Sequence, residues 1–300
     1  MVPVVARTPP GDATTTGEAL IAMSEFTVHP LLDTGTVGIT DVLCRGQCRH
    51  RSAEECARVT HLVFPYRGLY LRHVGAEQSV ADANHVLFFN AEEGYQVSHP
   101  VAGGDASLVL SISPMLLGEL APADLLQRRG EALFRAQSRR IDPRAQALVA
   151  LLRHSLRHRA IEPLEAESLG LTLLCRSLGP RTSHGATATR ARRRLVDRVK
   201  VLLAGDLGRR WSLADIATEI GGSPVYLTQV FQQVEGMPLH RYHLRLRLAR
   251  ALDLVAGCED MSALAQDLGF SSHSHFAAAF KQVHGRTPSA FRQAALAKSG

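Results

Sequence analysis

The sequence lacks any run of about 18 consecutive apolar residues, so no segment resembles a membrane-spanning helix. Residues 1–17 also lack the apolar stretch of a secretory signal. The five cysteines are odd in number and unevenly placed, which fits a reducing cytosol better than a disulfide framework. No phosphate-binding glycine loop, nucleophile elbow or catalytic triad motif is present. These absences predict a cytoplasmic protein without a membrane contact, a catalytic site or a cofactor.

All of the excess positive charge lies in the last third of the chain. Residues 190–300 contain 16 Lys and Arg against 9 Asp and Glu, whereas residues 1–189 contain 18 against 19. A basic surface attracts polyanions because each neutralised phosphate releases condensed counterions. The charge pattern therefore favours a nucleic-acid partner for the last third, with a basic surface that only improves solubility as the alternative.

Residues 26–113 show the pattern of a β-rich domain. Short apolar runs recur at short intervals and are separated by turn residues, mainly glycines. These runs lie at residues 62–64, 69–71, 86–89 and 108–110. Many short strands at such spacing predict a β-sandwich or barrel. Residues 1–25, which carry several prolines and a run of threonines, are expected to form a disordered tail.

After residue 114 the apolar residues take helical spacing. One helix is predicted around residues 145–156, and a second over residues 164–178. The apolar stripe of the second would consist of Leu164, Leu171, Leu174 and Leu178. The pair could form a dimer interface or pack onto the sheet of its own chain. Residues 179–189 are small, polar and rich in helix breakers, which predicts a domain linker.

The last third then reads as a helix followed by a helix-turn-helix unit. The inner face of the first helix, over residues 192–204, would consist of Leu195, Val199 and Leu202. Ser212 is a suitable N-cap for the next helix, and Gly221 is a suitable end for it. Ser223-Pro224 combines an N-cap with a proline at the first helical position, which predicts a further helix that ends near Gly236.

This unit occurs twice. Phe231 and Phe280 are 49 residues apart, whereas Gly221 and Gly269 are 48 residues apart, so the second turn contains one additional residue. The inner positions match in kind while the outer positions differ, as expected of two copies of one scaffold that read different sequences. This register, on the basic part of the chain, outweighs the alternative of a helical bundle that touches no DNA.

A long helix over residues 238–256 would separate the two units. At a rise of about 1.5 Å per residue, it would be roughly 25–30 Å long. A rigid helix of this size would hold two recognition helices about 34 Å apart, which is about one turn of B-DNA. The sequence therefore predicts a footprint in adjacent major grooves.

The second unit also carries a family signature. Its residues 264–276, followed by Phe280-Lys281, residues 285–288 and Phe291-Arg292, resemble the signature of the AraC/XylS family of bacterial transcription regulators. Residues 245–251 of the long helix are also similar to that family. The resemblance covers about residues 195–293, a third of the chain.

The resemblance implies a sequence-specific DNA-binding transcription regulator with an α+β two-domain fold. A cupin-like β-barrel or sandwich with flanking helices would occupy residues 26–180 and serve effector sensing or dimerisation. A linker would occupy residues 181–191, and an all-α domain with two helix-turn-helix units residues 192–297. Double-stranded promoter DNA is the implied partner. A homodimer partner, RNA polymerase and a small-molecule effector are further candidates.

The candidate DNA-contacting residues lie at the start and on the outer face of the two recognition helices. In the first unit they are Ser223, Val225, Thr228, Gln229 and Gln232; in the second they are Ser272, His273, Ser274, Ala277, Ala278 and Lys281. Glutamine can bond adenine bidentately, so Gln229 is expected to be the main base reader, while Val225 and Thr228 can contact a thymine methyl group.

The second recognition helix departs from the family pattern. The family usually has a polar or basic side chain where Ala277 or Ala278 stands. We therefore expect this unit to make fewer hydrogen bonds to bases and to rely more on phosphates and on His273. The N-terminus of each recognition helix presents free N–H groups and the positive end of the helix dipole, where a phosphate can bind.

Two other groups of residues keep alternative functions open. A thiol redox sensor or zinc site could use Cys44, Cys48, His50, Cys56 and His61, although structural zinc sites usually show two paired clusters. A cupin-type metal-binding enzyme fused to a DNA-binding domain could use His85, Glu92, Glu93 and His99. The strand region contains no His-x-His motif, so the sequence predicts no metal site and leaves the effector-binding residues undefined.

Overall fold

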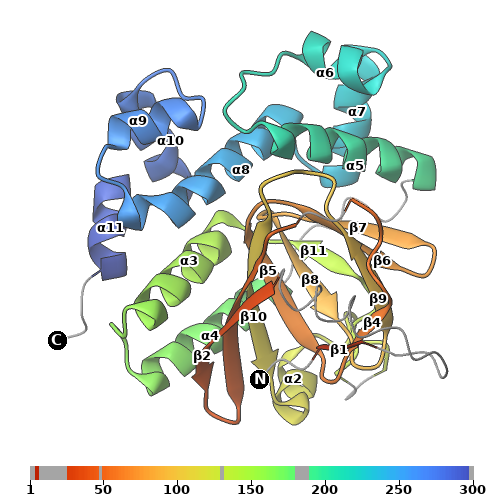
Figure 1. Cartoon of the computed structure of the whole chain (residues 1–300), viewed down its shortest axis with the longest axis vertical. Coiled ribbons are helices and arrows are strands. Elements are labelled where there is room, and N and C mark those ends of the chain that lie inside the picture. Colours follow the sequence, from red (N-terminus) through yellow and green to blue (C-terminus); the bar gives the residue numbers. More distant parts are fainter. Residues whose placement is uncertain (1–3, 7–25, 47–48, 129–131, 180–188, 297–300) are drawn as a thin grey trace, which may run out of the picture. The chain divides into compact units, whose positions relative to one another are not determined.

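The computed structural model describes residues 4–6, 26–46, 49–128, 132–179 and 189–296 (Figure 1). The chain divides into two compact units, one formed by residues 1–179 with 295–300 and the other by residues 180–294. The first unit is rich in strands and the second is helical, which confirms the expected α+β organisation. Within the described ranges, no helix is both long and apolar enough to cross a membrane.

Two antiparallel sheets form the β-rich unit (Figure 1). The strand order is β11-β8-β5-β10-β3-β2 in the six-stranded sheet and β1-β4-β9-β6-β7 in the five-stranded sheet. Neither sheet closes on itself within the described residues, so the barrel form of the prediction is wrong and the open two-sheet form holds. The strands are β1 (Val4–Ala6), β2 (Phe26–Asp33), β3 (Val37–Cys44), β4 (Glu55–Ala57), β5 (His61–Arg67), β6 (Tyr70–Val74), β7 (Glu77–Ala81), β8 (His85–Phe89), β9 (Gly94–Ser98), β10 (Asp105–Ile112) and β11 (Ser138–Arg140).

The central strands of the six-stranded sheet, β5, β8 and β10, are buried on both faces, which explains their continuous apolar runs. Successive side chains of a strand point to opposite faces. In β5, Leu62 and Phe64 belong to the core cluster that includes the helices, while Val63 belongs to a second cluster. Tyr70 and Tyr95 of the five-stranded sheet complete that second cluster, so the two sheets pack face to face.

Helices α2 (Pro114–Leu120), α3 (Pro143–Arg157) and α4 (Pro163–Leu178) cover the other face of the six-stranded sheet. The expected apolar stripe of α4 was wrong in one position, because Leu164 is 76% exposed. The buried stripe includes Gly170, where an added Cβ would lie 3.2 Å from Cγ1 of Val37. This close approach requires a small residue at the contact, so α4 faces the sheet with Gly170 and turns Leu164 to solvent.

Helix α3 brings cationic side chains to the sheet. Asp41 of β3 is fully buried and accepts a hydrogen bond of 2.6 Å from the Tyr66 hydroxyl. The Arg157 guanidinium lies 3.0 Å from the same carboxylate, and the Arg153 guanidinium lies 4.0 Å from the centroid of the Tyr66 ring. The basic residues of α3 therefore compensate a buried carboxylate.

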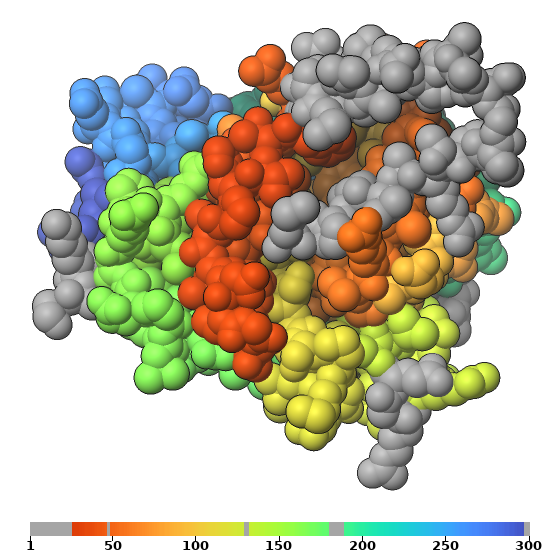
Figure 2. Space-filling view, turned by 60° about the horizontal axis from the view of Figure 1, so that its bottom comes forward, coloured from red at the N-terminus to blue at the C-terminus, as the bar shows by residue number. Residues whose placement is uncertain are grey.

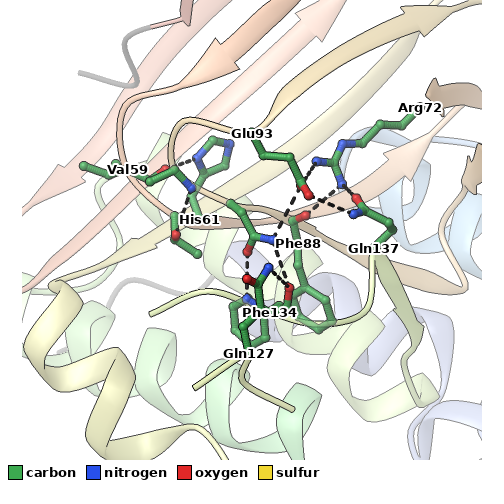
Figure 3. Close-up of polar contacts among 11 residues, drawn as sticks. Val59, His61, Arg72, Phe88, Glu93, Gln127, Phe134 and Gln137 are labelled. Carbon is green, nitrogen blue, oxygen red and sulfur yellow. Dashed lines mark hydrogen bonds and ion pairs between the residues drawn. The ribbon is translucent and has the colours of Figure 1, made fainter. Parts of the chain in front are cut away.

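A second buried charge, Arg72 of β6, fixes the segment that precedes β11 (Figure 3). Its guanidinium donates to the Phe88 carbonyl at 2.8 Å and to Gln137 Oε1 at 2.5 Å. It also pairs with Glu93 at 3.2 Å and stacks on the Phe89 ring at 4.0 Å. Because Arg72 is 1% exposed, these partners replace the hydration that its charge has lost.

Each sheet has an edge strand near the start of the chain, β1 in the five-stranded sheet and β2 in the six-stranded sheet. Val4–Ala6 form β1 and pair with β4, so these residues depart from the expected tail; the rest of residues 1–25 lies outside the described residues. Valine favours extended backbone, which explains the departure. At one edge of the six-stranded sheet, β2 is largely exposed, and Figure 2 shows its red atoms at the surface beside the green helices. Pro30 of β2 lacks an N–H group, which limits pairing with a further strand.

The described part of the helical unit contains seven α-helices and one short 3-10 helix (Figure 1). They are α5 (Arg190–Gly205), α6 (Leu213–Ile220), α7 (Pro224–Glu235), α8 (Leu239–Leu254), η1 (Val255–Gly257), α9 (Met261–Asp267), α10 (His273–His284) and α11 (Pro288–Leu296). Residues 181–188 of the predicted linker lie outside the described residues. Helix α5 begins at Arg190, two residues earlier than expected, because Thr189 caps it.

The predicted inner face of α5 was correct at Val199 only. Leu195 and Leu202 are half-buried, and the fully buried side chains are Val196, Val199 and Leu203. Two of the three buried positions lie one residue later than predicted and Val199 is shared, so the face is rotated by less than the roughly 100° that separates successive residues of a helix. The rotation places Lys200 inside the unit, where it lies 2.6 Å from Glu235 of α7.

Candidate nucleic-acid interface

The first helix-turn-helix unit consists of α6, a glycine turn and α7. Ser212 caps α6 and forms a reciprocal capping box with Asp215, because the side chain of each residue accepts a hydrogen bond from the backbone N–H of the other. Gly221 ends α6 with a φ of 83°, a value that is cheap only for glycine. The Ser223 hydroxyl then accepts from the Tyr226 N–H at 3.2 Å and opens α7. The predicted caps and turn are confirmed.

The second unit repeats this design with α9 and α10. Asp260 caps α9 by accepting from the N–H groups of Ser262 and Ala263. The Ser272 hydroxyl accepts from the His275 N–H at 3.1 Å and opens α10, as predicted. Gly285 ends α10 in the left-handed region, with a φ of 78°.

The structure leaves all of the predicted DNA-contacting residues of α7 accessible. Val225 is 66% exposed, and Gln229 and Gln232 are also exposed. Thr228 is half-buried, and its hydroxyl donates to the Pro224 carbonyl at 2.8 Å. This bond satisfies the hydroxyl within the helix, so the methyl group is the part of Thr228 that is free for an apolar contact.

On α10, the predicted residues His273, Ser274, Ala278 and Lys281 are exposed, and Ala277 is half-buried. The neighbouring His275 has a different environment. Its Nδ1 atom lies 3.0 Å from the Ser271 hydroxyl, and its ring packs edge-on against Phe270 at 5.6 Å between centroids. His275 therefore stabilises the turn, while the His273 imidazole remains accessible.

Tyr226 is a candidate contact residue that the sequence analysis missed. It is 47% exposed and precedes Gln229 by three residues, so both lie on neighbouring positions of the α7 surface. Its position three residues before Gln229 would have been enough to identify it from the sequence. Gln233, further along α7, accepts a hydrogen bond of 3.0 Å from Arg192 of α5, which connects the basic start of α5 to the recognition helix.

Arg247 of α8 connects the second helix-turn-helix unit to the loop that precedes the first. Its guanidinium donates to the carbonyl oxygens of Leu207 at 2.6 Å and Arg209 at 2.7 Å, both in the loop after α5. The same side chain lies 3.5 Å from the Gly269 carbonyl in the turn of the second unit. Arg210 adds a bond of 3.3 Å to the Phe270 carbonyl. The long helix therefore fixes the second turn against the loop that precedes the first unit.

Burial controls the ionisation of His243 on α8. Burial lowers the pKa of His243 to about 4, and the nearby Arg247 charge acts in the same direction. The Leu207 carbonyl and Asp206 oppose this shift but do not outweigh it. Its Nε2 atom is buried without a hydrogen-bond partner among the described residues. His243 is therefore neutral at physiological pH and acts as part of the core.

The β-rich unit separates the residues that the alternative hypotheses grouped together. His61 stacks on Phe89, and burial lowers its pKa to about 4. His85 pairs with Asp82 at 2.8 Å, and Glu93 pairs with Arg72. Cys48 lies outside the described residues.

Cys44 instead lies beside His99 and Asp105, a grouping that sequence reasoning missed. The Cys44 Sγ atom lies 3.6 Å from His99 Nε2, and an Asp105 oxygen lies 3.0 Å from the same nitrogen. Burial lowers the pKa of His99, but the contacts with Asp105 and Cys44 outweigh it and raise the pKa to about 10.

The comparisons with known proteins agree with this architecture. A family model described as a helix-turn-helix domain matches residues 216–294. The HTH-type transcriptional activator AarP of Providencia stuartii is 32% identical over 111 residues, which cover 37% of this chain and 82% of AarP. The chain therefore belongs to the AraC/XylS family of transcription regulators.

Other relatives match over shorter parts of their length. The regulatory protein PocR of Salmonella typhimurium is 32% identical over 82 residues, or 27% of each chain. The uncharacterized HTH-type transcriptional regulator YidL of Escherichia coli is 34% identical over 99 residues, or 33% of each chain. The chain thus spans about a third or less of these two relatives. The crystal structure of an AraC-type transcriptional regulator from Chromobacterium violaceum aligns with 35% of this chain and 96% of that chain, at 27% identity and a TM-score of 0.33.

Proposed function

We propose that this chain is a sequence-specific DNA-binding transcription regulator whose two recognition helices, α7 and α10, enter successive major grooves of promoter DNA. The observation that carries the proposal is the duplicated, serine-capped scaffold, whose outer helix faces are accessible and whose second turn is tied through Arg247 to the loop that precedes the first unit. A rigid pair of exposed recognition helices on the basic third of a chain matches the geometry and charge of B-DNA.

The proposal gives the exposed residues separate roles. Gln229 reads an adenine, and Val225 with the Thr228 methyl group contacts a thymine methyl. Gln232 and Tyr226 lie on the same accessible helix and border that contact. The free N–H groups next to Ser223 hold a phosphate at the N-terminus of α7.

In the second unit, the accessible groups favour phosphate contacts over base contacts. Lys281 provides the charge, His273 and Ser274 lie at the N-terminus of α10, and the Ser272 cap leaves N–H groups for a phosphate. Ala277 and Ala278 contribute apolar contacts to bases without hydrogen bonds. We therefore assign most of the hydrogen-bonded sequence readout to the first unit and much of the positioning to the second.

The family membership supports a regulatory role for the β-rich unit. We infer that this unit, with a cupin-like arrangement of its two open sheets, responds to a small-molecule effector or mediates homodimerisation, and that RNA polymerase is a further partner. Measurement of the oligomeric state of the full chain, with and without candidate effectors, tests these two roles. A monomer whose DNA binding no effector changes would contradict both.

Selection of bound sequences from a random duplex library with the full chain tests the DNA-binding proposal. We expect enrichment of a motif with two half-sites about one helical turn apart, roughly 10 base pairs. Recovery of sequences without any enriched motif would contradict a sequence-specific function.

A further inference from the structure

The residues Cys44, His99 and Asp105 converge at one end of the β-rich unit. Cys44 is the last residue of β3, Asp105 is the first residue of β10, and these two are directly paired in the sheet. His99 follows β9 of the other sheet. Within the described residues, these three side chains offer a sulfur, a nitrogen and an oxygen atom that all lie within 4.8 Å of one another.

The geometry differs from that of a catalytic thiol with a hydrogen-bonded relay. In such a relay the carboxylate contacts one ring nitrogen of the histidine and the thiol contacts the other. Here Asp105 and Cys44 both approach Nε2 of His99, at 3.0 and 3.6 Å, while Nδ1 is buried without a hydrogen-bond partner among the described residues. One N–H group cannot serve two acceptors well, so the three groups converge on a point instead of forming a chain.

The three side chains are also placed where burial of their charges requires compensation. Cys44 and His99 are each 6% exposed, and Asp105 is 8% exposed. Buried charges in proteins are either paired or bound to metal ions. A cation bound at the point where the three side chains converge would compensate the buried Asp105 carboxylate.

Close backbone packing holds the three residues in place. A Cβ on Gly104 would lie 2.3 Å from the Cys44 carbonyl oxygen, and a Cβ on Gly46 would lie 2.9 Å from Cα of Gly104 and 3.2 Å from the His99 ring. Glycines at these two positions, both at positive φ, let the segments after β3 and before β10 approach each other. The Gly46 N–H also donates to Cys44 Sγ at 3.3 Å, a contact that helps to fix the position of the sulfur.

We propose that Cys44, His99 and Asp105 form a binding site for one Zn²⁺ ion, with the fourth ligand position filled by a water molecule or another exogenous ligand. Zinc binds sulfur, nitrogen and oxygen ligands in tetrahedral geometry at about 2.0–2.3 Å, which places neighbouring ligand atoms about 3.2–3.7 Å apart. The distance of 3.6 Å from His99 Nε2 to Cys44 Sγ lies in that range, and the distance of 3.0 Å to the Asp105 oxygen lies just below it. The site lies outside the recognition helices and departs from the sequence-based expectation of no metal.

Metal titration of the full chain tests the proposal. Protein stripped of metal with a chelator is titrated with Zn²⁺ in competition with a chromophoric chelator, and separately with Co²⁺. We expect one high-affinity equivalent of zinc per chain and, with cobalt, a sulfur-to-metal charge-transfer band. Cys44→Ser and Asp105→Asn should each weaken zinc binding about 10- to 100-fold or more and Cys44→Ser should abolish the charge-transfer band.

Cys56→Ser is the matched control, because Cys56 is also 6% exposed and lies in the same unit but outside the cluster. It should leave zinc affinity and the cobalt spectrum unchanged. The titration of the wild-type chain requires no variant, so a variant that fails to fold does not obscure the result. Absence of a tight equivalent in the wild-type chain overturns the proposal, as does equal zinc binding by wild type and Cys44→Ser. Neither outcome bears on DNA binding by the helical unit.

Discussion

A methyl group on Gly269 would lie 2.2 Å from the carbonyl oxygen of Gly208, so the turn of the second helix-turn-helix unit and the loop after α5 are in backbone contact. Arg247 completes this junction through the carbonyl oxygens of both segments. The relationship matters because it fixes the second turn to the loop that leads into the first unit. Without it, α8 alone would determine how far apart the two recognition helices lie.

Gly269→Ala should therefore destabilise the helical unit more than Gly285→Ala does. Both glycines have a φ near 78°, but nothing lies within 4 Å of an added Cβ at Gly285. The strained backbone alone costs about 1–2 kcal/mol, and the clash at Gly269 adds roughly 1–3 kcal/mol. Urea denaturation of the two variants measures the difference. Equal stabilities would show that the junction is not tightly packed.

The Lys200–Glu235 pair should be essential to the packing of α5 against α7. The two charges lie 2.6 Å apart with side chains that are each 7% exposed, so either single replacement leaves a buried charge without its counter-ion. Lys200→Met and Glu235→Gln should each destabilise the protein by about 3–5 kcal/mol, and the double variant should recover part of that loss. The half-exposed pair Arg176–Asp142 is the control, where Arg176→Met should cost about 1 kcal/mol or less. Strict additivity of the two buried replacements would contradict the coupling.

His243 should make stability depend on pH. Its pKa is about 4 in the folded chain and 6.5 when unfolded, so the unfolded state binds more protons between these values. The contribution of His243 to the free energy of unfolding is fully present above pH 6.5. It is lost as the pH falls toward 4, and the loss is at most about 3 kcal/mol. His61 adds a loss of the same sign in the β-rich unit, so the informative quantity is the difference between wild type and His243→Gln.

When unfolding is measured from pH 7 to pH 4.5, the loss of stability should be smaller in His243→Gln than in the wild type. His240→Gln, on the exposed side of the same helix, is the control. An unchanged pH slope in His243→Gln would show that His243 does not contribute.

Gln229→Ala should change specificity and not general affinity. Loss of one bidentate contact costs about 1–3 kcal/mol of discrimination at a single base pair, and the salt dependence of binding should stay the same. Lys281→Ala should do the opposite, with uniform weakening on all sequences and a salt slope smaller by about 1. Titrations on a panel of single-base operator variants at several salt concentrations separate the two. A uniform loss of binding in Gln229→Ala would refute its assignment as a base reader.

Local signals in the sequence predicted the helical unit well. Ser212, Ser223 and Ser272 each cap the helix that follows, and glycines end the helices where predicted, because caps and turns depend on neighbouring residues. The inner face of α5 was misjudged by one residue, since Leu195 and Val196 are both apolar and only the packing against α7 and α8 decides between them.

Features that depend on distant residues could not be predicted. The contact of Cys44 with His99 spans 55 positions, and that with Asp105 depends on the register of β3 and β10, which no local pattern specifies. The same holds for Arg247, which binds the Leu207 carbonyl, 40 residues away. Leu164 was misplaced because α4 meets the sheet through a face that contains Gly170, Leu173 and Leu174 and excludes Leu164.

The most direct test of the central claim is the affinity of the full chain for its selected operator, measured at physiological salt against a random duplex and against the operator with five base pairs inserted between its half-sites. Two recognition helices in successive grooves predict a preference of about 1,000-fold or more over random DNA. The insertion turns the second half-site by about half a helical turn, to the opposite face, and should remove most of that preference. Equal affinity for the operator and the random duplex would contradict the claim, as would an insertion that has no effect.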